Sequence, residues 1–257
     1  MRRIVIAVIV GLSLATSALA EQASRLDDII KRGTLRVGMT GDYRPFTSLD
    51  MTTGKFSGFD VDMAESLGKA LGVKVEYVPT AWPQLMKDFE ADGFDIAMGG
   101  VSITFDRQKK GLFSLPIMRE GKTPIARCAD QGKYESLADI DKAGTRVIVN
   151  PGGTNERFAR ANVKNAEIKV YNDNVTIFDQ IAKGDADLMM TDSSETRYQQ
   201  KIHAGVLCAV HPDKPFDFAE KAYWLQRDSA FKAFVDQWLH LSMEDGSFKK
   251  IYSVWFE

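Results

Sequence analysis

The sequence has few of the residues from which metal centres are built. Its 257 residues include two Cys and three His, and His203, His211 and His240 show no ligand spacing with each other or with a Cys. A protein-bound zinc or similar metal needs a cluster of such ligands. We therefore expect no metal site, and nothing else in the sequence indicates a cofactor.

An excess of charge of either sign is also absent. Lys and Arg number 33 against 35 Asp and Glu, which gives a formal net charge of −2. Proteins that bind nucleic acid usually present a surplus of basic residues to the phosphate backbone. The charge balance therefore argues against nucleic acid as a partner. No internal repeat and no low-complexity segment is visible, so the composition is that of an ordinary globular protein.

Long hydrophobic runs are missing except near the start. Arg2 and Arg3 precede an apolar run over residues 4–14, which ends in the small-residue pattern Ala-Leu-Ala at residues 18–20. This is typical of a secretory signal peptide, and the run is too short to span a bilayer comfortably. No Cys follows Ala20 to suggest a lipid anchor. We predict cleavage after Ala20, export to the periplasm, and no membrane span in the rest of the chain.

Both Cys residues, Cys128 and Cys208, lie in the part of the chain that would be exported. An even number of Cys in an oxidising compartment favours a disulfide, so we predict a bond between these two. The alternative is a pair of free, buried thiols. Their separation of 80 positions along the chain gives no information about their distance in space.

Strand-like and helix-like segments alternate along the chain in two blocks. Among them we expect strands at residues 34–39 and 94–98 and helices at residues 174–181 and 247–256. This pattern predicts an α/β fold of two lobes with mostly parallel sheets. We place lobe 1 at residues 21–121 plus 218–257, and lobe 2 at residues 122–217, as an insertion. Extended apolar segments at residues 121–128 and 215–225 are the expected crossings between the lobes.

The stretch ADLMMTDSSETR, residues 186–197, is the strongest candidate for a functional site. Its apolar start predicts a buried strand, and carboxylates just beyond the C-terminal end of such a strand face a ligand crevice. Asp192 and Glu195 are three positions apart and would share one face of the helix that follows. The simpler alternative is a capping box with a solvated Glu.

Four other segments combine residue types that suit a ligand site. The loop after the first strand contains Tyr43 and Phe46, and Trp82 follows another strand beside Pro83, which suits the first turn of a helix. Packing within the loop is the alternative role for these aromatic residues.

Hydroxyl groups and a guanidinium come together at residues 102–107, where Ser102, Thr104 and Arg107 offer the chemistry that holds a carboxylate. A surface Arg beside a capping Thr would explain the same residues. The glycine-rich loop at residues 150–155 opens a helix, whose free N–H groups favour an anion. It lacks the Lys and the spaced glycines of a phosphate-binding loop, so a carboxylate is the better prediction for Gly153 and Thr154. Its simpler role is to start the helix.

Five short motifs occur in an order that resembles the periplasmic amino-acid-binding proteins of solute-binding protein family 3. They are GDYxPF at residues 41–46, GFDVD at 58–62, DIAM at 95–98, SITxxR at 102–107 and DLMMTD at 187–192. The resemblance implies a periplasmic-binding-protein fold of type II, in which two lobes joined by two hinge crossings close on a ligand. It also implies that Arg107, with Ser102 or Thr104 and the backbone at Thr154, binds a carboxylate. In a receptor that serves an ABC permease, Asp192 would bind an ammonium.

A narrower resemblance is to the cyclohexadienyl dehydratases, exported enzymes on this scaffold that convert prephenate to phenylpyruvate and arogenate to phenylalanine. It rests on PTAWP at residues 79–83, GKTP at 121–124, NPGGTNE at 150–156, DNVTIF at 173–178 and PFDFAEKAY at 215–223. The resemblance implies that Glu195 is the general acid. A Glu has a reference pKa of about 4.3, so it donates a proton at neutral pH only if burial or a nearby carboxylate raises that value.

The substrate of such an enzyme has two carboxylates and a ring. We assign the carboxylates to Arg107, Lys122 and the amides of Gly153 and Thr154, and we count Asn155 in the same loop as substrate-binding. Trp82, with Tyr43 or Phe46, would wall the ring and exclude water. Fold alone does not separate an enzyme from a transport receptor, because both share it. The sequence leaves open whether the protein is a homo-oligomer.

Overall fold

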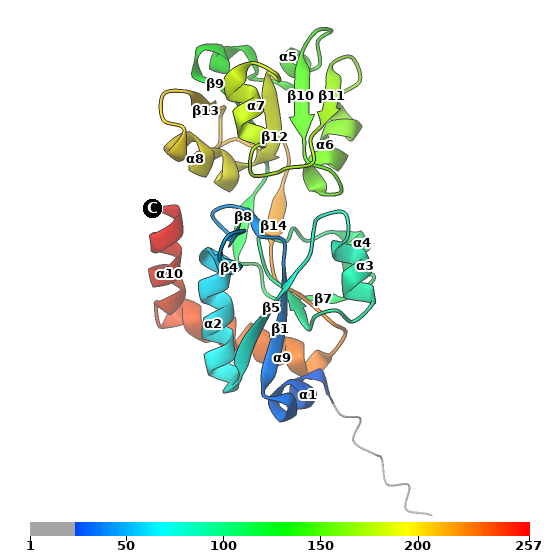
Figure 1. The fold of residues 1–257 in the computed structure, drawn as a ribbon, viewed down its shortest axis with the longest axis vertical. Coiled ribbons are helices and arrows are strands. Elements are labelled where there is room, and N and C mark those ends of the chain that lie inside the picture. The colour runs from blue at the N-terminus through cyan, green and yellow to red at the C-terminus, as the bar shows by residue number, and fades with distance from the viewer. Residues whose placement is uncertain (1–23) are drawn as a thin grey trace, which may run out of the picture.

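The structure is a computed structural model that describes residues 24–257. The signal peptide predicted for residues 1–20 lies outside the described residues. Within the described part of the chain, no helix is both long and apolar enough to cross a membrane. The protein has an α/β fold with two five-stranded sheets, one in each of the two lobes seen in Figure 1.

Lobe 1, at the bottom of Figure 1, is built on a sheet with the strand order β5-β1-β6-β15-β7. The interior strand β1 runs parallel to β5 and β6, whereas β15 is antiparallel to β6 and β7. The bounds are β1 (Thr34–Met39), β5 (Lys74–Pro79), β6 (Ile96–Ala97), β7 (Leu112–Phe113) and β15 (Trp224–Leu225). β15 comes late in the chain, so the chain re-enters lobe 1 after it has built lobe 2.

Helices enclose the lobe 1 sheet, and α10 packs on α2 and α9. A small separate sheet, β2-β3-β4, lies at the edge of lobe 1 that faces lobe 2, and it contains Tyr43. The bounds are α1 (Arg25–Arg32), α2 (Phe59–Leu71), α3 (Leu85–Glu90), α4 (Phe105–Gln108), α9 (Ser229–Glu244), α10 (Ser247–Phe256), β2 (Asp42–Tyr43), β3 (Thr47–Asp50) and β4 (Lys55–Ser57).

Lobe 2, at the top of Figure 1, has the strand order β11-β10-β12-β9-β13. β12 is parallel to β10 and antiparallel to β9, and all five of its residues are buried. The bounds are β9 (Lys122–Arg127), β10 (Arg146–Val149), β11 (Glu167–Val170), β12 (Leu188–Asp192), β13 (Leu207–Ala209), α5 (Leu137–Ile140), α6 (Thr154–Asn162), α7 (Ile177–Lys183), α8 (Ser193–Ile202) and the 3-10 helix η1 (Cys128–Lys133).

Two antiparallel strands lie between the lobes, β8 (Met118–Glu120) and β14 (Ala219–Lys221). Their register sets Ala219 opposite Glu120 and Lys221 opposite Met118. Each strand enters or leaves lobe 2 through a short segment, so the lobes are joined by two crossings of the chain.

Three element boundaries differ from those predicted from the sequence. The helix expected over residues 174–181 begins only at Ile177, because the carboxylate of Asp173 accepts the N–H groups of Val175 and Thr176 in a turn. Pro83 lies in the turn before α3, which the carbonyl of Ala81 closes, and not in the first turn of the helix. The strand expected over residues 94–98 is limited to β6, which is followed by two glycines with positive φ.

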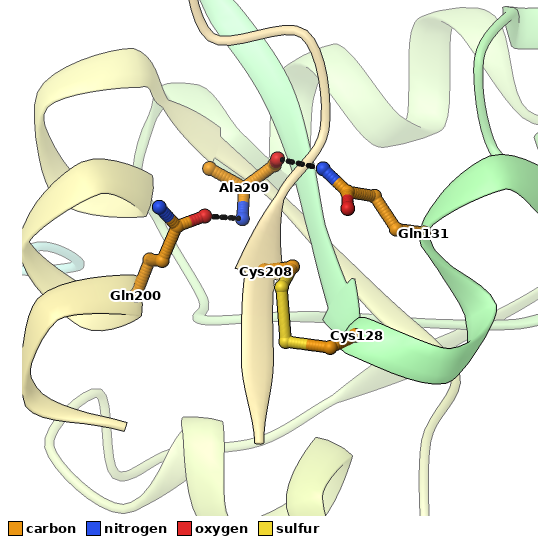
Figure 2. Close-up of a disulfide and its surroundings, with 5 residues drawn as sticks. All are labelled: Cys128, Gln131, Gln200, Cys208 and Ala209. Atoms are coloured by element: carbon orange, nitrogen blue, oxygen red, sulfur yellow. Dashed lines mark hydrogen bonds between the residues drawn. A yellow bond between two sulfur atoms is a disulfide. The ribbon is translucent and has the colours of Figure 1, made fainter. Parts of the chain in front are cut away.

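The predicted disulfide between Cys128 and Cys208 is confirmed, with the two Cα atoms 4.7 Å apart (Figure 2). It joins the start of η1 to the edge strand β13. Gln131 and Gln200 flank the next residue, since Gln131 Nε2 donates to the carbonyl of Ala209 and the N–H of Ala209 donates to Gln200 Oε1, each at 2.8 Å. The two glutamine side chains thus hydrogen-bond both backbone groups of Ala209, on the edge strand β13.

We predict that the double variant Cys128→Ser, Cys208→Ser unfolds at a lower urea concentration than the wild type. The bond joins residues 80 positions apart, and a cross-link of that span stabilises a protein by about 3 to 5 kcal/mol. Adding dithiothreitol to the wild type should reproduce the shift and leave the double variant unchanged. Equal urea midpoints for the oxidised wild type and the double variant would contradict the prediction.

Candidate functional site

The carboxylate of Asp192, at the C-terminal end of β12, lies where the two lobes meet. The register of β9 against β12 sets Lys122 opposite Asp192, and Lys122 Nζ is 2.7 Å from Asp192 Oδ1. Lys221, on the crossing strand β14, places its Nζ 2.6 Å from Oδ2, and the hydroxyl of Tyr43 donates to the same oxygen at 2.6 Å. All four side chains are buried. Residues from both lobes and from a crossing therefore share one carboxylate.

Opposite charges decide the ionisation of this cluster. Burial alone would raise the pKa of Asp192, but the charges of and hydrogen bonds from Lys122 and Lys221 outweigh it and hold that pKa well below its usual range. Burial opposes the charge on Lys221 as well, yet Asp192 and Glu120 raise the pKa of Lys221. Burial lowers the pKa of Lys122. Asp192 is therefore ionised and bound by two lysines.

Glu195, in the first turn of α8, is in a different state from Asp192 although it is three residues away. Its residue exposure is 1%, and burial is the largest cause that raises its pKa to about 8, with the charges of Asp192 and Asp42 adding to the effect. The hydroxyl of Thr191 donates to Glu195 Oε2. Glu195 Oε1 has no hydrogen-bond partner among residues 24–257. The side chain is thus protonated at neutral pH.

The simpler interpretation of this stretch, a capping box with a solvated Glu, is wrong. Asp192 does occupy the N-cap position of α8, but within the described residues its side chain makes no capping hydrogen bond. Its oxygens accept from Lys122, Lys221 and Tyr43 instead. Because Glu195 is buried, it has no contact with bulk solvent that would keep it ionised.

Lys122 and the helix start at α6 form one hydrogen-bonded unit. Lys122 Nζ donates to Thr154 Oγ1 at 2.9 Å, to Asn155 Oδ1 and to Asp192 Oδ1. An ammonium has three N–H donors, so all three are used. Asn155 Nδ2 donates to Asn150 Oδ1 at 3.1 Å and to Thr191 Oγ1 at 3.0 Å. Asn155 was predicted to bind substrate, but its side-chain amide is hydrogen-bonded to neighbouring side chains.

The carboxylate-binding group predicted around Arg107 is assembled only in part. Arg107 and Ser102 line the central cavity, whereas Thr104 lies outside it and caps α4 by accepting the N–H of Arg107. Arg107 Nη1 donates to the carbonyl of Ser102 at 2.8 Å, and Ser102 Oγ accepts from Lys221 at 2.9 Å. Burial lowers the pKa of Arg107 to about 10, so the guanidinium is charged at neutral pH.

The central cavity between the lobes is small, about 20 Å³, which is room for roughly one water molecule. Tyr43 and Trp82 line it, with their rings edge to face at 5.6 Å. Phe46 stacks behind Tyr43 at 5.2 Å between ring centroids and belongs to the core of lobe 1. The residues that line the cavity are Tyr43, Trp82, Gly100, Ser102, Arg107, Asn150, Gly153, Thr154, Asn155, Asn174, Asp192 and Lys221.

Lobe closure brings backbone close to backbone at the edge of this cavity. A Cβ added to Gly152, on lobe 2, would be 2.6 Å from the Cα of Pro83, on lobe 1. Gly152 also has a φ of 80°, which glycine adopts without strain. Asn174 Nδ2 donates across the lobes to the carbonyl of Asp42 at 2.9 Å. The structure is therefore in a closed state.

Several polar residues of this site were not predicted from the sequence. Lys221 could have been found, because alternate residues of an extended crossing face the same side and a Lys among aromatic neighbours is unusual there. Glu120, whose Oε1 is 3.3 Å from Lys221 Nζ, reaches the site through the pairing of the two crossing strands, and Asp42, which accepts from Trp82 Nε1 at 3.0 Å, through packing within lobe 1. Asn174 lies in a turn that was expected to be helical. Among residues 24–257, no group of three or more His, Cys, Asp or Glu could hold a metal ion.

Comparison with known proteins places this geometry in context. The family described as bacterial extracellular solute-binding proteins, family 3, matches residues 35–257. Cyclohexadienyl dehydratase of Pseudomonas aeruginosa is 55% identical over 244 residues, which are 95% of this chain and 90% of that protein.

Two solved structures of ancestral proteins overlay on the chain. One is an amino acid-binding protein described as a precursor of cyclohexadienyl dehydratase, with a TM-score of 0.84, 36% identity, and coverage of 91% of this chain and 100% of that one. The other is an ancestral cyclohexadienyl dehydratase, with a TM-score of 0.57, 54% identity, and coverage of 91% and 97%.

The raised pKa of Glu195 predicts a pH-dependent loss of stability. The pKa is about 8 in the folded protein against an ordinary 4.5, so the folded state keeps a proton that the unfolded state loses. The stability due to this proton is complete below pH 4.5 and is lost as the pH rises to about 8, by about 1.4 kcal/mol for each pH unit. Urea unfolding across this range should show the loss in the wild type.

The matched comparison uses Glu195→Gln, which cannot titrate, and Glu244→Gln, which alters an exposed Glu on α9. The stability of Glu195→Gln relative to the wild type should rise between pH 5 and pH 8, and that of Glu244→Gln should stay level. Parallel pH profiles for the wild type and Glu195→Gln would show that Glu195 is ionised in the folded protein.

Proposed function

The chain belongs to the bacterial extracellular solute-binding proteins of family 3, and on that scaffold we propose that it is a cyclohexadienyl dehydratase. It converts prephenate to phenylpyruvate and arogenate to phenylalanine, with Glu195 as the general acid. The enzyme acts in the periplasm after cleavage of the signal peptide behind Ala20, in keeping with the extracellular family and with the apolar run near the start of the sequence.

The reaction couples two bond cleavages across one ring. The electron pair of the bond to the departing carboxylate moves into the ring, carbon dioxide leaves, and the bond from the opposite carbon to its hydroxyl breaks. Hydroxide is a poor leaving group, so a proton from Glu195 lets it depart as water. The ring becomes aromatic, and Glu195, then a carboxylate, regains a proton from solvent before the next turnover. Positioned acids of this kind contribute about 10² to 10⁴-fold to rate.

One observation supports this function above the others: a buried glutamic acid is protonated at neutral pH and has an oxygen without a hydrogen-bond partner among residues 24–257. The pKa of Glu195 is raised to about 8, and its Oε1 is without a hydrogen bond in the described structure. A solute receptor has no use for a neutral acid in this position, whereas elimination of a hydroxyl requires one. The close relative supports the same reaction.

The charge of the cluster suits a substrate with two carboxylates. Arg107, Lys122 and Lys221 supply three positive charges against those of Asp192 and Glu120, so positive charge is in excess even when Glu120 is ionised. We assign the substrate carboxylates to Arg107, to the amides of Gly153 and Thr154, and to the positive charge of Lys122. The N–H groups of Lys122 already have partners, so it acts by its charge.

The alternative function is an amino-acid receptor that delivers its ligand to an ABC permease. In that function Asp192 must accept hydrogen bonds from the ligand ammonium. Its Oδ1 already accepts from Lys122, and its Oδ2 from Lys221 and Tyr43. A ligand ammonium would have to displace a buried lysine, which costs the ion pair. The structure of the site therefore favours the enzyme.

Substrate entry requires the lobes to separate. The cavity of about 20 Å³ is far below the roughly 300 Å³ or more of ordinary small-molecule sites. The ancestral dehydratase is more similar to this chain in sequence than the ancestral amino acid-binding protein is, yet it overlays less well. A different relative angle between two conserved lobes would produce this difference. We infer that the closed form excludes water during the reaction, and that Trp82 and Tyr43 then wall the ring.

We predict that the purified protein forms phenylpyruvate from prephenate and that Glu195→Gln lowers kcat by about 10² to 10⁴-fold. Because the protonated acid is the active form, kcat should be constant at lower pH and fall about tenfold per unit as the pH rises through about 8. Glu244→Gln serves as the control and should retain the wild-type rate. Absence of turnover by the wild type, together with tight binding of a proteinogenic amino acid, would establish the receptor instead.

A further inference from the structure

A second cavity, of about 540 Å³, lies between α8 of lobe 2 and α10 of lobe 1. Figure 1 shows the end of α10 below α8, and Lys201 Nζ on α8 donates to the carbonyl of Glu257, the residue after α10, at 3.1 Å. Both crossings line the cavity too, through Arg119 and Phe218. Its volume is that of ordinary small-molecule sites, which are about 300 to 1,000 Å³. Within the described chain it shares no lining residue with the central cavity, so it is a separate candidate site.

A buried hydroxyl group at this cavity is without a partner. Ser194, in the first turn of α8, lines the cavity and is 9% exposed, and its Oγ makes no hydrogen bond within residues 24–257. The N–H of Ser194 donates to Glu120 Oε2 at 3.1 Å, and Glu120 Oε1 is paired with Lys221 Nζ at 3.3 Å, so that carboxylate is already engaged. Buried hydroxyl groups normally make hydrogen bonds. Ser194 Oγ therefore marks the place where an uncharged polar group of a ligand would bind.

Aromatic rings form the wall that α10 contributes. Tyr252, Trp255 and Phe256 all line the cavity, because residues three and four positions apart share one face of a helix. The rings of Tyr252 and Phe256 stack with their centroids 4.6 Å apart, and Trp255 Nε1 donates to Asp62 Oδ2 at 2.7 Å. These contacts fix the rings in place. An aromatic ring of a ligand would find stacked or edge-to-face partners here.

The charges around the cavity leave one guanidinium available to a ligand. Besides Glu120, the lining contains three cationic and two anionic side chains, which are Arg119, Arg197, Lys201, Asp213 and Asp217. Arg197 Nη2 is paired with Asp213 Oδ1 at 2.6 Å. Arg119 stands over the ring of Phe218, 4.7 Å from its centroid, and forms no ion pair among residues 24–257. A guanidinium in this state can bind a carboxylate through two parallel hydrogen bonds.

We propose that this cavity is a second ligand site, which binds an aromatic carboxylate anion. The ring of the ligand packs against Tyr252 and Trp255, its carboxylate pairs with Arg119, and an uncharged oxygen beside the carboxylate accepts from Ser194 Oγ. Because both lobes and both crossings line the cavity, an occupant favours the lobe angle of this structure. Binding here does not require the reaction proposed for Glu195.

An anion suits this cavity better than a zwitterion. The ammonium of an amino acid would meet the positive charges of Arg119 and Lys201, and Glu120 already has Lys221 as its partner. Phenylpyruvate has the ring, the carboxylate and an uncharged keto oxygen. 3-Phenylpropanoate lacks the keto oxygen, and L-phenylalanine has an ammonium in its place. These three compounds therefore probe the ring and carboxylate, the hydroxyl contact and the charge separately.

The first experiment is calorimetric titration of Arg107→Met with 3-phenylpropanoate. This variant lacks the guanidinium of the central cavity, so binding there is weakened. We expect saturable binding, which Arg119→Gln in the same background weakens by about 10-fold or more, as for a lost hydrogen bond to a charged group. Arg160→Gln removes an exposed guanidinium outside both cavities and should leave the affinity unchanged. Absence of binding, or equal affinity with and without Arg119→Gln, overturns the proposal.

Tryptophan fluorescence locates the ligand without the Arg107→Met background, so the answer does not depend on the folding of that variant. 3-Phenylpropanoate does not absorb where tryptophan is excited, and Trp255 lines the second cavity whereas Trp82 lines the central one. Binding should change the emission of the wild type and of Trp82→Phe. The same titration of Trp255→Phe should lose that change. A response that Trp255→Phe retains in full rejects the proposal.

The class of ligand is tested by titrating phenylpyruvate and L-phenylalanine into Arg107→Met. Phenylpyruvate should bind about 2- to 10-fold more tightly than 3-phenylpropanoate, as for one added hydrogen bond, and Ser194→Ala should remove that difference. L-Phenylalanine should bind more weakly than either anion. If L-phenylalanine binds the most tightly, the cavity takes a zwitterion and the assignment of an anion is wrong. None of these titrations involves turnover, so the result is independent of whether the protein is a dehydratase.

Discussion

The carboxylate of Asp192, bound by two buried lysines, is the interaction on which the rest of the site depends. A buried charge without partners costs several kcal/mol, and removing one partner of a buried pair costs about 3 to 5 kcal/mol. Lys122 comes from lobe 2, Lys221 from a crossing strand, and Tyr43 from lobe 1. The closed arrangement of the lobes and the ionised state of Asp192 therefore depend on each other.

This ion pair also explains how a scaffold for binding can support elimination. In the alternative function, as a receptor, the aspartate would be the counterion of the ligand. Here it is the counterion of the protein's own lysines, so its charge is neutralised before a substrate arrives. Its residual negative charge still raises the pKa of Glu195 nearby. The lysines neutralise the charge of Asp192, and burial keeps Glu195 protonated. Two carboxyl groups within one turn of the chain therefore have opposite protonation states.

Much of the fold could be predicted from the sequence, because local patterns determine it. Strand β1 and helix α10 have the predicted bounds, and the buried strand that ends at Asp192 was expected from its apolar run. The site was predicted less completely. Asp192, Arg107 and Trp82 line the cavity as expected, but Phe46 and Thr104 do not, since their orientation depends on packing and on a helix cap. Glu120 and Asp42 reach the site through the pairing of the crossing strands and through packing within lobe 1, which join residues far apart in the sequence and are not encoded by a local pattern.

The disulfide between Cys128 and Cys208 lies within lobe 2, and both described ends of the chain lie in lobe 1. Tension applied to the two ends would pass along the crossings to the cysteines and then directly through the sulfur atoms. Residues 129–207, which include Asn155, Thr191 and Glu195, would carry none of that load. The acid and two of the residues hydrogen-bonded around it, Asn155 and Thr191, thus lie in a mechanically shielded loop, while the hinge remains free to bend.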